Sequence, residues 1–131
     1  MLTKRQLLTG FACAAALALV SPAFAMDKQP FDAKAFEAAQ TAGRPILIDV
    51  SAPWCPTCKA QAPILQKLTA DPKFKNLAVF VVDFDSRKDV LRDFNVRTQS
   101  TLIVFKGKQE AGRSTGDTNA ASIAALLNKA I

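Results

Sequence analysis

Two cysteines separated by two residues, Cys55 and Cys58, are the residues of this chain best suited to carry chemistry. A disulfide stabilises a fold mainly by closing a long loop, and a pair three positions apart closes a very short one. Such a pair is suited instead to thiol–disulfide exchange or to metal binding. A third cysteine, Cys13, lies in an N-terminal apolar segment, and the chain contains no histidine. A Cys–His nucleophile is therefore excluded.

The position of the pair predicts a separate role for each thiol. Cys55 follows an apolar run at 46–50 and opens a predicted helix over 55–69, in which Pro56 suits the first helical position. Free N–H groups and the helix dipole at such a position stabilise a thiolate, which is the attacking species. We therefore expect Cys55 to be the exposed nucleophile. Cys58, one turn later, is expected to be more buried and to resolve the mixed disulfide.

Asp49 places a carboxyl group inside the apolar run that precedes the cysteines. Burial disfavours the charged form, so we expect the pKa of Asp49 to be raised. A buried carboxylate is costly unless it is paired or used. This cost favours a functional group over a core polar group that is merely satisfied, although both interpretations remain open.

Helices and strands alternate along the rest of the chain. Helices are predicted over 33–41, 55–69 and 87–94, strands over 46–50, 77–82, 101–105 and 109–114, and a last helix capped by Thr118 or Asn119. Residues 27–30 are interpreted as a short leader. Gly107 and Lys108 form a tight turn, so the last two strands should pair as a hairpin. The pattern predicts an α/β domain with a central mixed β-sheet, helices on both of its faces, and a C-terminal β-hairpin plus helix.

Residues 1–25 have the pattern of a secretory signal peptide. Lys4 and Arg5 precede an apolar stretch at 7–20, and Ala23-Phe24-Ala25 supplies the small residues of a cleavage site. We expect cleavage after Ala25, a periplasmic location and a single domain over 26–131 without stable membrane insertion. An uncleaved anchor is an alternative, and both the general and the twin-arginine export routes are compatible with the segment.

The charge of the chain is modest and dispersed. Cleavage would lower the formal net charge from +6 to +4, because residues 1–25 carry two cations and no acid. The remaining basic residues form no run and are not interleaved with aromatic residues, so no nucleic-acid partner is expected.

The segment from Asp49 to Lys59, Asp-Val-Ser-Ala-Pro-Trp-Cys-Pro-Thr-Cys-Lys, resembles the active-site segment of thioredoxins. The residues at 62–65 resemble the family's helix with an internal proline. The residues at 101–106 resemble its later strand, and Gly116 resembles the glycine before its last helix. The resemblance covers nearly all of residues 31–131. It implies a thioredoxin fold and thiol–disulfide exchange with protein substrates, with no cofactor and no bound metal.

The resemblance also assigns roles to individual residues. It implies a redox disulfide between Cys55 and Cys58 and makes Asp49 the proton acceptor for the resolving thiol. Trp54 would offer a flat apolar surface to partners. The substrate-binding candidates are Trp54, Pro56, Thr57, Gln99, Ser100 and Thr101.

One residue departs from the family pattern, because Ser100 stands where the family places a cis-proline beside the cysteines. A cis bond before a residue other than proline costs about 2.5–4 kcal/mol, so we expect a trans Gln99–Ser100 bond with local rearrangement. The change makes general thioredoxin-like substrate binding less certain and favours a narrow partner range.

The leading hypothesis is a periplasmic dithiol reductant that receives electrons from a membrane thiol-reductant transporter. The Cys-Pro-Thr-Cys motif resembles that of reductants in cytochrome c maturation, but it shares its first proline with oxidising disulfide donors. A disulfide donor is therefore one alternative. A metal or Fe–S carrier is another, although two cysteines supply only half of a tetrahedral site. A binding domain without turnover is the third.

Overall fold

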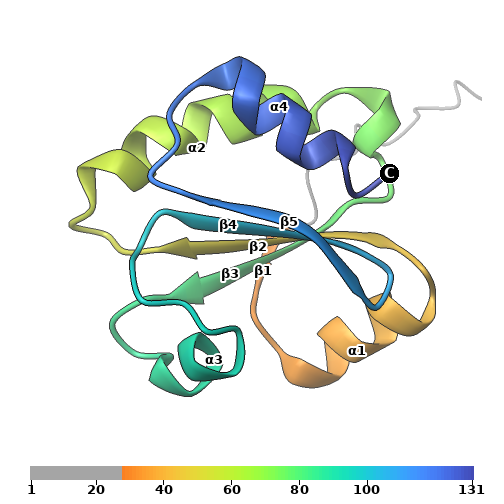
Figure 1. The fold of residues 1–131 in the computed structure, drawn as a ribbon, viewed down its shortest axis with the longest axis horizontal. Coiled ribbons are helices and arrows are strands. Elements are labelled where there is room, and N and C mark those ends of the chain that lie inside the picture. The colour runs from red at the N-terminus through yellow and green to blue at the C-terminus, as the bar shows by residue number, and fades with distance from the viewer. Residues whose placement is uncertain (1–27) are drawn as a thin grey trace, which may run out of the picture.

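A computed structural model describes residues 28–131, which form a five-stranded sheet between two layers of helices (Figure 1). The strands are β1 (Lys28–Pro30), β2 (Pro45–Ser51), β3 (Ala78–Asp83), β4 (Thr101–Lys106) and β5 (Gln109–Thr115). Their order across the sheet is β1-β3-β2-β4-β5. β1 and β2 run parallel to β3, whereas β4 runs antiparallel to β2 and β5. The predicted mixed sheet and the C-terminal hairpin are confirmed.

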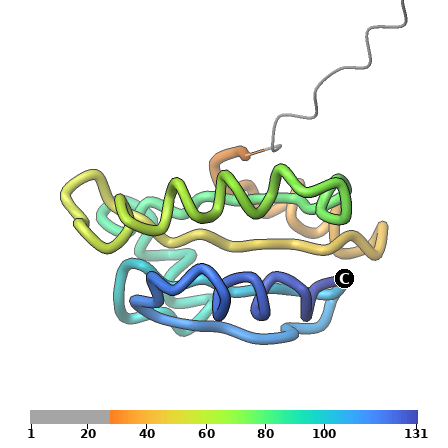
Figure 2. The backbone as a smooth tube through the Cα atoms, turned by 90° about the horizontal axis from the view of Figure 1, so that it is seen from above, coloured from red at the N-terminus to blue at the C-terminus, as the bar shows by residue number. Residues whose placement is uncertain are grey.

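Within residues 28–131, four α-helices cover the two faces of this sheet. They are α1 (Ala33–Thr41), α2 (Pro56–Thr69), α3 (Lys88–Asp93) and α4 (Ala120–Asn128), and a 3₁₀ helix, η1, spans Pro72–Phe74. Figure 1 shows α2 and α4 on one face and α1 and α3 on the other. In the view of Figure 2, α2 and α4 run along the sheet beside each other. The prediction of helices on both faces is therefore confirmed.

Side-chain caps explain where two of these helices begin. The Asp32 carboxylate accepts a hydrogen bond from the backbone N–H of Ala35 at 2.8 Å and starts α1. Of the two caps predicted for the last helix, Asn119 is the one used, because its side-chain oxygen accepts from the N–H groups of Ala121 and Ser122. These three bonds satisfy donors that lack a partner in the first turn of a helix.

β2 lies at the centre of the sheet and is buried on both faces, as its apolar run predicts. Ile46, Ile48 and Val50 pack into the core cluster that also contains residues of α1 and α3. Leu47 packs into the opposite cluster, beneath α2 and α4. Because side chains alternate along a strand, Asp49 lies on the same face as Leu47, under α2.

The interpretation of residues 27–30 as a leader is wrong for the part that the structure describes. Lys28, Gln29 and Pro30 form β1 and pair in parallel with β3, with Lys28 opposite Val79. The N–H of Phe31 also donates to the carbonyl of Val81 at 2.8 Å. Backbone pairing rather than side-chain burial holds this segment, so a hydrophobicity pattern does not reveal it.

The predicted signal peptide at 1–25 lies outside the described residues. Within 28–131, no helix combines the length and the apolar character that crossing a membrane requires.

Candidate active site

The two cysteines lie where β2 passes into α2 and are joined by a disulfide bond. Cys55 is the N-cap of α2, with extended backbone angles, and Pro56 takes the first position of the helix. The Sγ atom of Cys55 accepts a hydrogen bond from the backbone N–H of Cys58 at 3.1 Å. The thiol of Cys55 therefore replaces the oxygen of an ordinary capping side chain, at the positive end of the helix dipole.

The expected exposure of the two cysteines is wrong. Cys55 is 1% exposed, whereas Cys58 is 8% exposed. Cys55 is more buried because it packs with Ala52 and the partly buried ring of Phe84, while its sulfur lies 3.1 Å from the hydroxyl of Ser100. Cys58 instead lines an open pocket, and Cys55 is not among the residues that line it.

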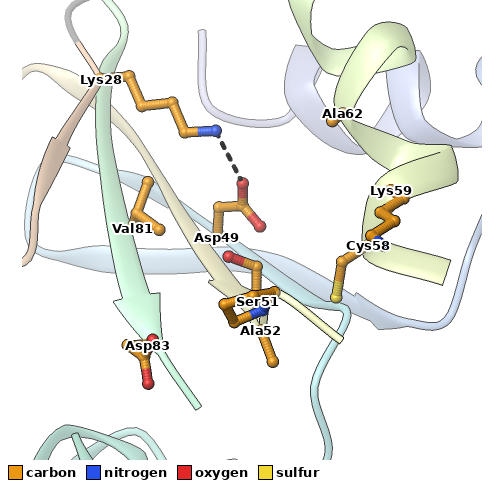
Figure 3. A pocket seen from close by; sticks show the side chains of 10 residues that line it. Lys28, Asp49, Ser51, Ala52, Cys58, Lys59, Ala62, Val81 and Asp83 are labelled. Carbon is orange, nitrogen blue, oxygen red and sulfur yellow. Dashed lines mark ion pairs between the residues drawn. The ribbon is translucent and has the colours of Figure 1, made fainter. Parts of the chain in front are cut away.

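This pocket joins Cys58 to the buried carboxyl group of Asp49. It has a volume of about 380 Å³ and is lined by Lys28, Asp49, Ser51, Ala52, Pro53, Cys58, Lys59, Ala62, Val81 and Asp83. Figure 3 shows Asp49 and Cys58 on its two sides, one on the sheet and one on α2. Asp49 and Cys58 therefore line the same open space, which no packed apolar layer divides.

Asp49 is 5% exposed, and its burial raises the pKa of its carboxyl group, as predicted from the sequence. The Nζ atom of Lys28 lies 3.8 Å from Oδ2 of Asp49 and acts in the opposite direction, lowering that pKa. Lys28 reaches the carboxylate from β1, as the dashed line in Figure 3 shows. Sequence reasoning missed this partner because it did not place the first described residues in the sheet.

Ser100 contacts both sulfur atoms. Its Oγ lies 3.1 Å from Sγ of Cys55 and 3.2 Å from Sγ of Cys58. The predicted trans Gln99–Ser100 bond is confirmed, since no peptide bond among residues 28–131 is cis. The local rearrangement appears at Ser100, whose φ angle is +65°. Such an angle is uncommon outside glycine and concentrates at functional sites.

Gln61 is a residue of the site that sequence reasoning missed. Its side chain is 1% exposed, and Nε2 donates to the carbonyl oxygens of Ser100 at 3.3 Å and of Asp117 at 2.8 Å. It thereby connects α2 to the loops on either side of the hairpin. The buried positions along α2 are Cys58, Gln61, Leu65 and Thr69, so their helical spacing was the available signal.

The six candidates for substrate binding have different surroundings. Trp54 is 54% exposed, and its indole N–H donates to Oδ2 of Asp85 at 2.8 Å. Pro56 is exposed, and Thr57 and Gln99 are half-buried around the cysteines. Ser100 is buried against the sulfurs.

Thr101 is also buried, but its hydroxyl donates to the carbonyl of Thr98 and lies 3.1 Å from Oγ1 of Thr115. The structure therefore brings Thr101 into the sheet and not onto the surface around the pair.

Among residues 28–131, no group of three or more Cys, Asp, Glu or His side chains is placed to hold a metal ion. What the geometry provides is a disulfide at a helix N-terminus, a carboxyl group across a pocket and an exposed tryptophan beside the pair. On this fold, these features define a thiol–disulfide oxidoreductase of the thioredoxin-fold class.

Comparisons with known proteins give the same class. The thioredoxin family model matches residues 27–129. Thioredoxin Asp f 29 of Aspergillus fumigatus is 35% identical over 96 residues, which cover 72% of this chain and 87% of that protein. Thioredoxin of Mycobacterium tuberculosis is 31% identical over 91 residues, covering 70% of this chain and 78% of that protein. The chain belongs to the thioredoxin family and is a protein-disulfide oxidoreductase.

Solved structures agree with this assignment. The structure of Trxlp from Edwardsiella tarda superimposes with a TM-score of 0.74 and 43% identity, covering 76% of this chain and 97% of that one. A Malassezia sympodialis thioredoxin superimposes with a TM-score of 0.68 at 20% identity, covering 78% of this chain and 88% of that one, and shows the fold alone.

Proposed function

We propose that this protein is an exported dithiol reductant that transfers electrons to disulfides in other exported proteins. The observation that carries the proposal is the shared pocket, in which the second cysteine of a helix-capping pair faces a buried carboxyl group across open space. This arrangement supplies an attacking thiol, a resolving thiol and a proton acceptor for the resolving thiol.

Cys55 is the attacking group in this proposal. Its thiolate attacks one sulfur of a substrate disulfide, a mixed disulfide forms, and the other substrate sulfur leaves as a thiolate. The N–H of Cys58 already donates to the Cys55 sulfur, so the negative charge has a partner at the helix N-terminus. Because Cys55 is 1% exposed, the substrate must dock closely around Trp54 to reach it.

Cys58 completes the reaction. Its thiol passes a proton to Asp49 through the pocket, and the resulting thiolate attacks Sγ of Cys55. The second substrate sulfur then leaves, so the substrate gains two electrons and the protein is left with the Cys55–Cys58 disulfide. Asp49 can accept the proton only when it is ionised, and Lys28 favours that state by lowering the pKa that burial raises.

The direction of electron flow is inferred from the short connection between β3 and β4. The strongly oxidising periplasmic disulfide donors carry an extra helical domain inside this fold. Here the connection from β3 to β4 contains only the six-residue helix α3. The Cys-Pro-Thr-Cys motif, which resembles that of reductants in cytochrome c maturation, also favours a reductant. After each turnover, a membrane thiol-reductant transporter would return the disulfide to the dithiol.

The reduction potential of the Cys55–Cys58 couple tests the direction. A reductant should equilibrate near the value of thioredoxin, about −270 mV, whereas an oxidising donor lies near −120 mV. The measurement uses glutathione or dithiothreitol buffers and mass spectrometry after alkylation. A value close to that of the oxidising donors would contradict the proposed direction and favour a disulfide donor.

The location is tested by the mature N-terminus. We expect the protein in a periplasmic fraction to begin at Met26, because the small residues of the cleavage site end at Ala25. An Ala23→Arg, Ala25→Arg double variant should retain the full chain. Full-length wild-type protein confined to the cytoplasm would contradict export.

A further inference from the structure

The hydroxyl group of Ser100 lies against both sulfur atoms of the redox pair. The two Oγ–Sγ distances, 3.1 Å to Cys55 and 3.2 Å to Cys58, differ by only 0.1 Å. Ser100 is 2% exposed, so water does not compete effectively for its proton. A hydrogen bond in such surroundings is electrostatically stronger than one in solvent.

Ser100 is held in place by contacts that do not involve the sulfurs. Its backbone N–H donates to the carbonyl of Val50 at 2.8 Å, and its own carbonyl accepts from the N–H of Gly116 at 3.1 Å. The Gln61 amide donates to the same carbonyl at 3.3 Å. The backbone of Ser100 is therefore held by β2, by α2 and by Gly116 just after β5, and none of these bonds involves a sulfur atom.

The hydroxyl has one proton to donate, and the strength of the hydrogen bond it forms differs between the oxidised and the reduced pair. A disulfide sulfur is a weak acceptor, whereas a thiolate is a charged one and accepts a shorter, stronger bond. The hydrogen bond from Ser100 therefore strengthens when the disulfide is reduced and Cys55 ionises. It adds a second donor to the N–H of Cys58, which already points at the Cys55 sulfur.

We propose that Ser100 is a catalytic residue whose hydroxyl donates to the Cys55 thiolate and stabilises the reduced, ionised form of the pair. The inference rests on the dithiol exchange of the proposed function and not on its compartment or direction. A group that stabilises the reduced form makes the couple less reducing. Ser100 therefore sets how strongly this protein reduces its substrates.

Other charged groups line the pocket that Cys58 also lines. These groups are Asp49, Lys28, Lys59 and Asp83. A test of Ser100 must therefore report the ionisation of Cys55 while leaving these groups unchanged.

The test is a thiolate titration of the reduced full chain carrying Cys13→Ala, so that only Cys55 and Cys58 contribute. Thiolate absorbance near 240 nm is read against pH. The chain contains no tyrosine and no histidine, so tyrosinate does not contribute to the signal and no imidazole titrates beside the pair. Ser100→Ala should raise the lower titration midpoint by about one pH unit, a tenfold loss of ionisation, since one unit is 1.36 kcal/mol.

Two further variants separate the hydroxyl from the backbone. Ser100→Gly also removes the hydroxyl, and glycine accepts the positive φ angle of this position without strain. It should raise the midpoint as much as Ser100→Ala does. Ser114→Ala is the matched control, because the Ser114 hydroxyl on β5 is buried and has no hydrogen-bond partner in the structure. It should leave the midpoint where it is.

The same variants predict a change in redox equilibrium. A tenfold change in the equilibrium constant of this two-electron couple corresponds to about 30 mV, so Ser100→Ala and Ser100→Gly should make the potential more negative by up to that amount. Unchanged midpoints in both variants, a shift in only one of them, or an equal shift in Ser114→Ala would overturn the role of Ser100. None of these outcomes bears on whether the protein is exported or reduces disulfides.

Discussion

The ammonium group of Lys28 on the edge strand β1 lies 3.8 Å from the buried carboxylate of Asp49 on the central strand β2. β3 separates these two strands in the sheet, so the Lys28 side chain reaches past β3 to the carboxylate. The contact links the first residues that the structure describes to the proton acceptor proposed for Cys58. Through this contact, the short strand β1 affects the ionisation of Asp49 as well as forming part of the sheet.

Replacement of Lys28 should change the pH at which Asp49 becomes ionised. Lys28 is 44% exposed at its side chain, and exposed ion pairs are worth up to about 1 kcal/mol. Because Lys28 lowers the pKa of Asp49, Lys28→Met should raise that pKa further. In the pH–rate profile of insulin reduction, the limb that reports the ionisation of Asp49 should move to correspondingly higher pH.

Two variants make that measurement specific. Lys34→Met removes an exposed lysine on α1 and should leave the profile unchanged. Asp49→Asn should abolish the limb that Lys28→Met moves. A limb that stays in place in Lys28→Met, or that persists in Asp49→Asn, would show that it belongs to another group.

Asp49 should lower the stability of the folded protein at neutral pH. A carboxyl group with a raised pKa in the folded state binds protons more tightly there, so its contribution to stability is present at low pH. That contribution is lost as the pH rises through the folded pKa. Asp49→Asn removes the buried charge and should raise the free energy of unfolding at pH 7 by about 1–2 kcal/mol.

Urea unfolding of the oxidised protein between pH 4 and pH 8 measures this difference. The gain from Asp49→Asn should shrink towards low pH, where the wild-type carboxyl group is protonated. The matched variant Asp93→Asn, at an exposed position of α3, should show no comparable change with pH. A gain that is absent or constant over the whole range would mean that Asp49 is not destabilised by burial.

Trp54 should matter for protein substrates and not for small disulfides. Its ring is 54% exposed beside the pair and is oriented by the hydrogen bond to Asp85. Tryptophans in such positions often contribute about 2 kcal/mol or more to binding. Trp54→Ala should therefore lower kcat/KM for insulin at least about tenfold. The rate with a small aromatic disulfide should change little, and an equal loss with both substrates would contradict a docking role.

Gln61 should stabilise the fold through its two carbonyl partners, Ser100 and Asp117. Gln61→Met keeps the length of the side chain but removes both donors, and should lower the free energy of unfolding by about 1–2 kcal/mol. Gln66→Met, at an exposed position of the same helix, is the control and should stay within about 0.5 kcal/mol of wild type. Equal effects of the two substitutions would remove the case for a buried hydrogen-bond network.

Most of the fold could be predicted from the sequence because its strands and helices carry strong patterns. The apolar run of β2, the turn at Gly107 and the cap at Asn119 each mark an element that the structure contains. β1 carries no such pattern, since a lysine, a glutamine and a proline show neither alternation nor β-propensity. Its place in the sheet depends on pairing with β3, a contact between segments about fifty residues apart.

The features of the site that lie on one continuous segment could be predicted from the sequence. The pair, its position before a helix and the raised pKa of Asp49 follow from the segment at 49–59. The burial of Cys55 does not, because Phe84 and Ser100 come from other parts of the chain. Family resemblance placed Ser100 near the pair, but its positive φ angle and its contact with both sulfurs require the assembled fold.

Trapping of mixed disulfides tests the central claim most directly. Cys58→Ser retains the proposed nucleophile and removes the thiol that releases the substrate. In the native compartment it should accumulate covalent complexes with exported, cysteine-containing proteins, each linked through Cys55 and released by dithiothreitol. Cys55→Ser and the double variant should yield none. An absence of complexes with Cys58→Ser, or complexes of Cys55→Ser in equal amount, would contradict the account.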